Sequence, residues 1–187
     1  MSAGKPEPLA IHGWTIFAHP LFLTQIEALA RQVEILKQND PAGYVNKNAS
    51  KRLAAITKLA FDAIPQDPTR PEYRQGGTLG DDHKHWFRAK FFQQYRLFFR
   101  YHAPSKVIVY AWVNDEDTKR AYESSYDAYR VFHKMLESGH PPDEWDQLLA
   151  EAQNESRRMQ ESLARVTAQE IGCFKFAYSV PQSNLSK

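Results

Sequence analysis

The stretch 83–114 holds the side chains most suited to binding phosphate. It contains no Asp or Glu, but six basic residues are interleaved with ten aromatic residues. The basic residues are Lys84, Arg88, Lys90, Arg96, Arg100 and Lys106. A solvated surface normally mixes both signs of charge, so a stretch of one sign favours binding of an anion. Cations neutralise phosphates and aromatic rings stack on bases, so this stretch predicts a nucleic-acid interface.

Strand periodicity gathers these cations on one surface. Three β-like runs with short separations predict an antiparallel meander, at residues 86–92, 95–101 and 106–113. Side chains alternate between the two faces of a strand, so Arg88 and Lys90 share a face, as do Arg96 and Arg100. If helices cover the opposite, apolar face, the cationic face stays open to a phosphate backbone. The alternative is a merely solvated outer face, where Arg and Lys are common.

Polar side chains after the meander complete the candidate set. Asn114 ends the last strand and can reach a site, while the adjoining Asp115 is typical of a turn and helix cap. A helix predicted at 126–138 carries Tyr126, Tyr129, His133 and Lys134. The two tyrosines fit core packing as well as they fit a functional role, and His133 and Lys134 fit a solvated helix face.

Other groupings carry less chemistry. Asp81, Asp82, His83 and His85 are metal-ligand types, but no third element with matching spacing is evident, so we expect no metal and no cofactor. The glycines at 76–80 lack the sequence and the strand-to-helix context of a phosphate loop. Cys173 has no visible base partner and is typical of an inert thiol.

The elements that must position these residues form an α+β pattern. A strand at 13–19 precedes helices at 20–38 and 49–64, the first with Pro20 at its start. The meander, the 126–138 helix and a long polar helix at 143–169 follow. This order predicts helices packed on one face of an antiparallel sheet. The apolar stripe of the last helix is thin, which leaves open whether it binds a partner or stays unpacked.

Composition indicates a soluble protein with a local charge pattern. The 187 residues suit one domain, and a net charge of +2 means that nucleic-acid binding requires cations concentrated on one surface. The single cysteine excludes an internal disulfide and fits a reducing compartment. Neither a signal peptide nor an apolar run long enough to span a membrane is evident, so we expect a cytoplasmic location.

Several short motifs together resemble one family. The run 95–101, Tyr-Arg-Leu-Phe-Phe-Arg-Tyr, resembles the third strand of RelE-like toxins and, in this fuller form, the YhaV family. The supporting matches, which occur in family order, are Gly13-Trp14, Ala18-His19-Pro20, residues 86–91, residues 112–116, Asp127-Ala128-Tyr129, Lys134-Met135-Leu136 and residues 139–142. Phe92-Gln93-Gln94 departs from the family, because it replaces a glycine-containing turn.

The resemblance implies both a fold and an activity. It implies a RelE-like fold with a four-stranded antiparallel sheet, two N-terminal helices on one face and additional C-terminal helices. The expected division is a flexible tail at 1–12, a toxin domain at 13–149 and a C-terminal helical extension and tail at 150–187. The implied function is that of an mRNA endoribonuclease toxin of a type II toxin–antitoxin pair, acting free or at the ribosome. Its implied partner is a PrlF-like antitoxin with an AbrB-like domain.

The residues then suggest how RNA would be cut without a metal. Attack of the ribose 2′-OH on the adjacent phosphate needs a base, cations for the developing charge and an acid for the leaving oxygen. The charge-stabilising candidates are Arg88, Lys90, Arg96 and Arg100, and the acid–base or stacking candidates are Tyr126, Tyr129 and His133. The further RNA-binding candidates are Lys84, Lys106, Asn114 and Lys134. The alternative is a non-catalytic module that blocks translation by occupying RNA or the ribosome.

Overall fold

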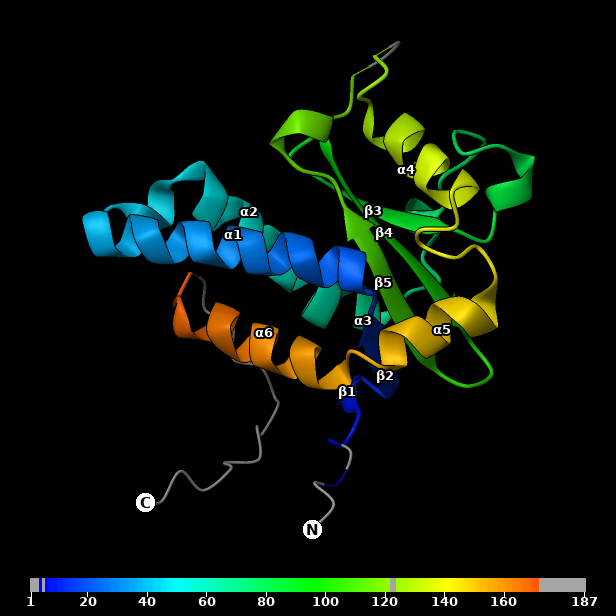
Figure 1. The fold of residues 1–187 in the computed structure, drawn as a ribbon, viewed down its shortest axis with the longest axis horizontal. Coiled ribbons are helices and arrows are strands. Elements are labelled where there is room, and N and C mark those ends of the chain that lie inside the picture. Colours follow the sequence, from blue (N-terminus) through cyan, green and yellow to red (C-terminus); the bar gives the residue numbers. More distant parts are fainter. Residues whose placement is uncertain (1–3, 5, 122–123, 172–187) are drawn as a thin grey trace.

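The protein is built on a five-stranded mixed sheet, seen in a computed structural model that describes residues 4, 6–121 and 124–171 (Figure 1). The strand order is β1-β2-β5-β4-β3. The strands are β1 (Leu9–Ile11), β2 (Trp14–Ala18), β3 (Phe87–Phe91), β4 (Tyr95–His102) and β5 (Val107–Val113). The β3-β4-β5 meander is antiparallel as predicted, but β2 runs parallel to β5, so the expectation of four antiparallel strands is wrong.

The first strand lies within the expected tail at 1–12. His12 and Gly13 both have positive φ, at 50° and 81°, and this backbone makes the tight turn that pairs β1 with β2. Leu9 is fully buried, so the hairpin extends the core. Of the remaining residues of the expected tail, residues 1–3 and 5 lie outside the described residues.

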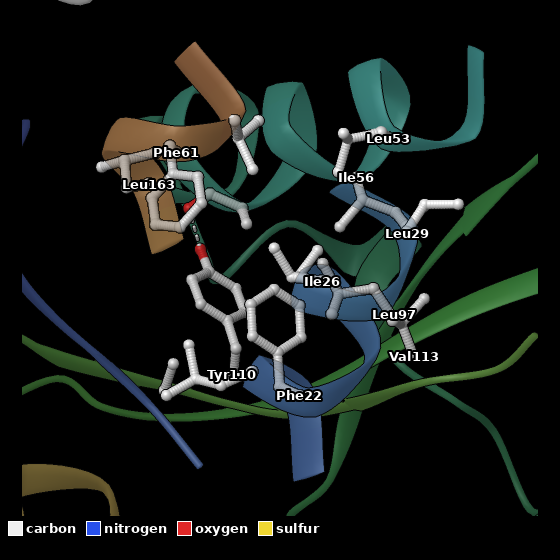
Figure 2. Close-up of a cluster of buried hydrophobic side chains, with 14 of the residues drawn as sticks. Phe22, Ile26, Leu29, Leu53, Ile56, Phe61, Leu97, Tyr110, Val113 and Leu163 are labelled. Atoms are coloured by element: carbon white, nitrogen blue, oxygen red, sulfur yellow. Dashed lines mark hydrogen bonds between the residues drawn. The ribbon is translucent and has the colours of Figure 1, made fainter. Parts of the chain in front are cut away.

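One face of the sheet is covered by α1 (Pro20–Asn39), α2 (Asn48–Lys58), α3 (Ile64–Gln66) and α6 (Ser156–Ala168). As predicted, Pro20 opens α1, and the His19 Nδ1 accepts a hydrogen bond from the Leu21 N–H at its N-terminus. Figure 2 shows α1 side chains such as Phe22 packed against Tyr110 of β5. The Tyr110 hydroxyl donates to the Ala60 carbonyl in the π-helical turn Leu59–Ala63 that follows α2.

The other face is also covered, by α4 (Ala128–Glu137) and α5 (Trp145–Gln153) (Figure 1). The expectation of an open cationic face is therefore wrong. The reason is that this face is apolar at its centre, where Phe98 and Trp112 lie side by side. Phe132 of α4 stacks on Phe98 with ring centroids 4.1 Å apart. Burying these rings requires a helix over the arginines of the same face.

The predicted helix at 143–169 is two helices, broken at Asn154 and Glu155. Leu148 and Ala152 of α5 pack on the α4 side of the sheet, whereas the buried side chains of α6 pack on the α1 side. A single straight helix cannot serve both faces. α6 lies beside α1, with Arg158 paired to Glu27 and Arg165 to Glu34, so its thin apolar stripe is used within the fold (Figure 1).

None of the described helices is both long enough and apolar enough to cross a membrane. Residues 172–187, which include Cys173 and the end of the expected extension, lie outside the described residues.

Candidate active site between the sheet and helix α4

Two arginines from adjacent strands meet at one tyrosine hydroxyl. Arg88 on β3 and Arg96 on β4 point to the same face, as the alternation predicted. Their Nε atoms donate to the Tyr129 hydroxyl oxygen over 2.8 and 3.2 Å, respectively. Tyr129 sits in the first turn of α4, directly over this face. The geometry joins three of the predicted residues into a single cluster.

Both guanidinium groups are buried among neutral partners. Arg88 is 8% exposed and Arg96 is 7% exposed. Arg88 also donates to the Glu72 carbonyl, and Arg96 to the carbonyls of Gln93 and Tyr95. Across the described ranges of the chain, neither guanidinium forms an ion pair with a carboxylate. Because an unneutralised buried charge is costly, the cluster favours the approach of an anion.

The start of α4 is fixed by Asp127. Its Oδ2 accepts the Tyr129 N–H over 3.1 Å, which caps the helix. Its Oδ1 accepts the Ala121 N–H over 2.9 Å and pairs with Arg120 at 2.5 Å. The Arg120 guanidinium in turn lies 4.9 Å from the centre of the Tyr129 ring. This contact supplies a third arginine, which could not be identified from the sequence because Arg120 lies in the connection between the predicted strand at 106–113 and the predicted helix at 126–138.

A shallow pocket of about 280 Å³ adjoins the cluster. Tyr129 lines it together with Arg130, His133 and Lys134 from successive turns of α4. The remaining lining residues are Thr78, Ser125 and Glu137. His133 Nδ1 lies 3.5 Å from the Glu137 carboxylate. The pocket is open to solvent, and its lining combines Tyr129 with an imidazole and two further cations.

Asn114 holds the end of β5 rather than facing the pocket. Its side chain is fully buried, and its Oδ1 accepts the Arg96 N–H over 2.6 Å. Its Nδ2 donates to the carbonyls of Gln94 and Thr118. The next residue, Asp115, caps the short 3-10 turn Glu116–Thr118, as its position predicted. This helical turn ends at Thr118. Asn114 therefore positions the backbone of Arg96.

The other predicted cations are spread over the sheet. Lys90 is exposed and lies opposite Arg96 in the β3–β4 register. Arg100 donates to the Asp143 carbonyl over 2.7 Å between the rings of Trp86 and Trp145, and burial lowers its pKa. Lys84, Lys106 and Tyr126 do not line the pocket. Lys84 forms an ion pair with Asp81, and Lys106 lies over the Trp14 ring. Tyr126 is 69% exposed.

A separate cluster brings together His83, His85 and Asp143. The Asp143 Oδ1 lies 2.7 Å from His85 Nε2 and accepts the Trp86 indole N–H over 2.7 Å. Burial tends to raise the pKa of Asp143, but these hydrogen bonds and the nearby imidazoles lower it overall. The sequence alone shows no third ligand for the two histidines, because Asp143 lies 58 or more residues after them and only the fold brings it close.

Comparison with known proteins identifies the family. A family described as toxins with endonuclease activity, belonging to toxin–antitoxin systems, matches residues 16–153. The ribonuclease toxin YhaV of Escherichia coli K12 is 45% identical over 148 residues, which span 78% of this chain and 96% of the relative. The toxin YhaV of Escherichia coli O157:H7 matches to the same extent. No solved structure matches the chain. The chain therefore belongs to the YhaV family of toxins.

Proposed function

We propose that this protein is the ribonuclease toxin of a type II toxin–antitoxin module and that it cuts mRNA at the Arg88–Arg96–Tyr129 cluster. The family supports the class of activity, since its description names an endonuclease of a toxin–antitoxin system. One observation supports the site. Two buried guanidinium groups share one phenol, without a carboxylate partner in the described part of the chain, beside a pocket open to solvent.

The cluster suits a phosphate that gains charge during reaction. In-line attack of the 2′-OH makes a pentacoordinate phosphorane with more negative charge on its oxygens than the starting diester. Fixed donors aimed at that charge stabilise it most in a site from which water is largely excluded. Arg88 and Arg96 provide such donors, and the register places Lys90 beside Arg96. These three side chains are our candidates for charge stabilisation.

The candidates for proton transfer are side chains that line the pocket. The Tyr129 oxygen accepts two hydrogen bonds, so its own O–H remains to contact the substrate. His133 lines the same pocket, and an imidazole can both accept and donate a proton near neutral pH. We assign Tyr129 to contact with the scissile phosphate, and His133 both to accept the proton of the 2′-OH and to return a proton to the leaving 5′ oxygen. Cleavage by this route needs no metal ion.

The antitoxin is a second part of the proposal. Membership in a toxin–antitoxin family supports a protein partner, and the sequence resemblance supports a PrlF-like antitoxin with an AbrB-like domain as that partner. Co-expression with the product of the adjoining gene, followed by size-exclusion chromatography, tests this. A stable complex that cleaves RNA more slowly than the free toxin is expected, whereas separate elution with full activity contradicts it.

Cleavage and occupancy are separated by comparing wild type with Arg88→Gln/Arg96→Gln. Purified proteins are incubated with a long mRNA, free and in a translating extract, while RNA binding is measured in parallel. Lys51→Gln/Lys58→Gln is the matched control, since it removes two exposed cations of α2, which covers the opposite face of the sheet. We expect cleavage to be lost only in the arginine variant. Intact RNA with wild type, together with arrested translation, would support the occupancy function instead.

A further inference from the structure

Three metal-ligand side chains gather where β3 and α5 begin, outside the arginine cluster. His83 and His85 lie just before β3, and Asp143 lies just before α5. One ligand atom from each, two imidazole nitrogens and one carboxylate oxygen, lies within 4.8 Å of the other two. The tertiary fold therefore brings together donors that are 58 to 60 residues apart in the chain.

The spacing of these atoms is close to that of a bound ion. Zinc bonds of about 2.0–2.1 Å in a tetrahedron place neighbouring ligand atoms roughly 3.3 Å apart. His83 Nδ1 already lies 3.3 Å from Asp143 Oδ1. His85 Nε2 lies 2.7 Å from the same oxygen, so this pair would have to separate by about 0.6 Å. A small rotation of a partly exposed imidazole supplies that change.

Neighbouring groups hold the carboxylate from outside the ligand set. The Trp86 indole N–H donates to Asp143 Oδ1 over 2.7 Å, and Arg100 donates to the Asp143 main-chain carbonyl over 2.7 Å. Such outer contacts orient the ligands of a metal site. The side chains of His83, His85 and Asp143 are 16%, 37% and 38% exposed, so an ion can enter from solvent and remain partly shielded.

The donor chemistry selects the ion. Two imidazoles and one carboxylate suit zinc and related transition metals, whereas magnesium and calcium prefer oxygen ligands alone. A fourth position remains for a water molecule. We propose that His83, His85 and Asp143 bind one Zn²⁺ ion that fastens the start of β3 to the start of α5.

This site is distinct from the nuclease cluster. Its three ligands are not among the residues that surround the Tyr129 hydroxyl or line the adjoining pocket. The ion therefore has a structural role and takes no part in phosphate cleavage. The same side chains without an ion form only a hydrogen-bonded latch, and this is the competing interpretation to be tested.

Metal binding by the full chain is measured directly, without reference to RNA cleavage. Metal-stripped protein is titrated with Zn²⁺ by calorimetry and with Co²⁺ by visible absorption. His85→Gln keeps a donor near the position of Nε2, toward Asp143, and Asp143→Asn keeps an acceptor for the Trp86 indole, so both preserve the latch. His12→Asn is the control, since its imidazole lies beside Asp62 at the turn between β1 and β2, on the opposite edge of the sheet from β3. Circular dichroism of metal-free samples checks that all variants fold.

We expect one ion per chain, with affinity at least about tenfold weaker in His85→Gln and Asp143→Asn and unchanged in His12→Asn. Zn²⁺ should also raise the melting temperature of wild type but not of the two ligand variants. Absence of Zn²⁺ binding, or equal binding by the ligand variants, would overturn the proposal and leave the hydrogen-bonded latch.

Discussion

Replacing Tyr129 by phenylalanine removes the one oxygen that the two buried arginines share. The ring and its packing on Phe98 remain, so the change is confined to the hydroxyl. The Nε donors of Arg88 and Arg96 then lose an acceptor in a buried setting. A buried donor without a partner costs roughly 1–3 kcal/mol, so the loss for the two donors lowers the free energy of unfolding by about 2–6 kcal/mol.

Tyr44→Phe provides the matched control for that loss. Tyr44 is also a buried tyrosine, and its hydroxyl donates to the Gln169 carbonyl over 2.6 Å on the opposite face of the sheet. Only one neutral acceptor loses its partner there, so the expected cost is about 1 kcal/mol. Urea unfolding followed by circular dichroism measures both variants under the same conditions.

The rate of RNA cleavage is the second property to compare between Tyr129→Phe and Tyr44→Phe. In Tyr129→Phe the phosphate loses a polar contact in a largely dry site, which corresponds to roughly a 100-fold lower cleavage rate. Tyr44→Phe should cleave at the wild-type rate when assayed well below its melting temperature. The reasoning is refuted if Tyr129→Phe costs no more stability than Tyr44→Phe and retains full activity.

Three further predictions concern the parts of the fold that support the site. Asn114→Ala removes the partner of the Arg96 main-chain N–H and of the Thr118 carbonyl, whereas the Gln94 carbonyl keeps the Arg120 N–H, so urea unfolding should show a loss of about 2–6 kcal/mol; a loss below about 0.5 kcal/mol would contradict its positioning role. Burial lowers the pKa of His19 from 6.5, although its hydrogen bond to Glu151 opposes this. The unfolded chain therefore binds the proton more tightly, and wild type should lose stability as the pH falls below about 6.5, while His19→Gln should show a flatter profile. Leu163→Ala should cost about 2–3 kcal/mol and speed amide hydrogen exchange in α6, and unchanged exchange would show that α6 is not held by this contact.

The sequence predicted local structure where short-range rules act. Alternation placed Arg88 and Arg96 on one face of the meander, and Pro20 marked the start of α1. Both results depend on residues adjacent in the chain, through strand periodicity and the missing proline N–H. The parallel pairing of β2 with β5 did not follow, because strands 90 residues apart carry no local signal of their alignment.

The candidate site, too, could be predicted only where residues close in the sequence determine it. The arginines and Tyr129 were identified by type, but the sequence could not show that α4 would cover them, because helical periodicity does not say which face of a sheet a helix will cover. Asp143 was missed as a partner of His83 for the same reason. A ligand or counter-charge supplied by a distant segment becomes visible only once the elements are packed together.

The ends of the cleaved RNA test the central claim most directly. Wild-type protein is incubated with mRNA in excess EDTA, and the new termini are analysed beside those from Arg88→Gln/Arg96→Gln. Attack by the 2′-OH at the arginine cluster predicts 2′,3′-cyclic phosphate and 5′-hydroxyl ends from wild type and none from the variant. Loss of cleavage in EDTA under conditions in which circular dichroism shows the metal-free protein to be folded, 5′-phosphate ends, or equal cleavage by the variant would contradict the account.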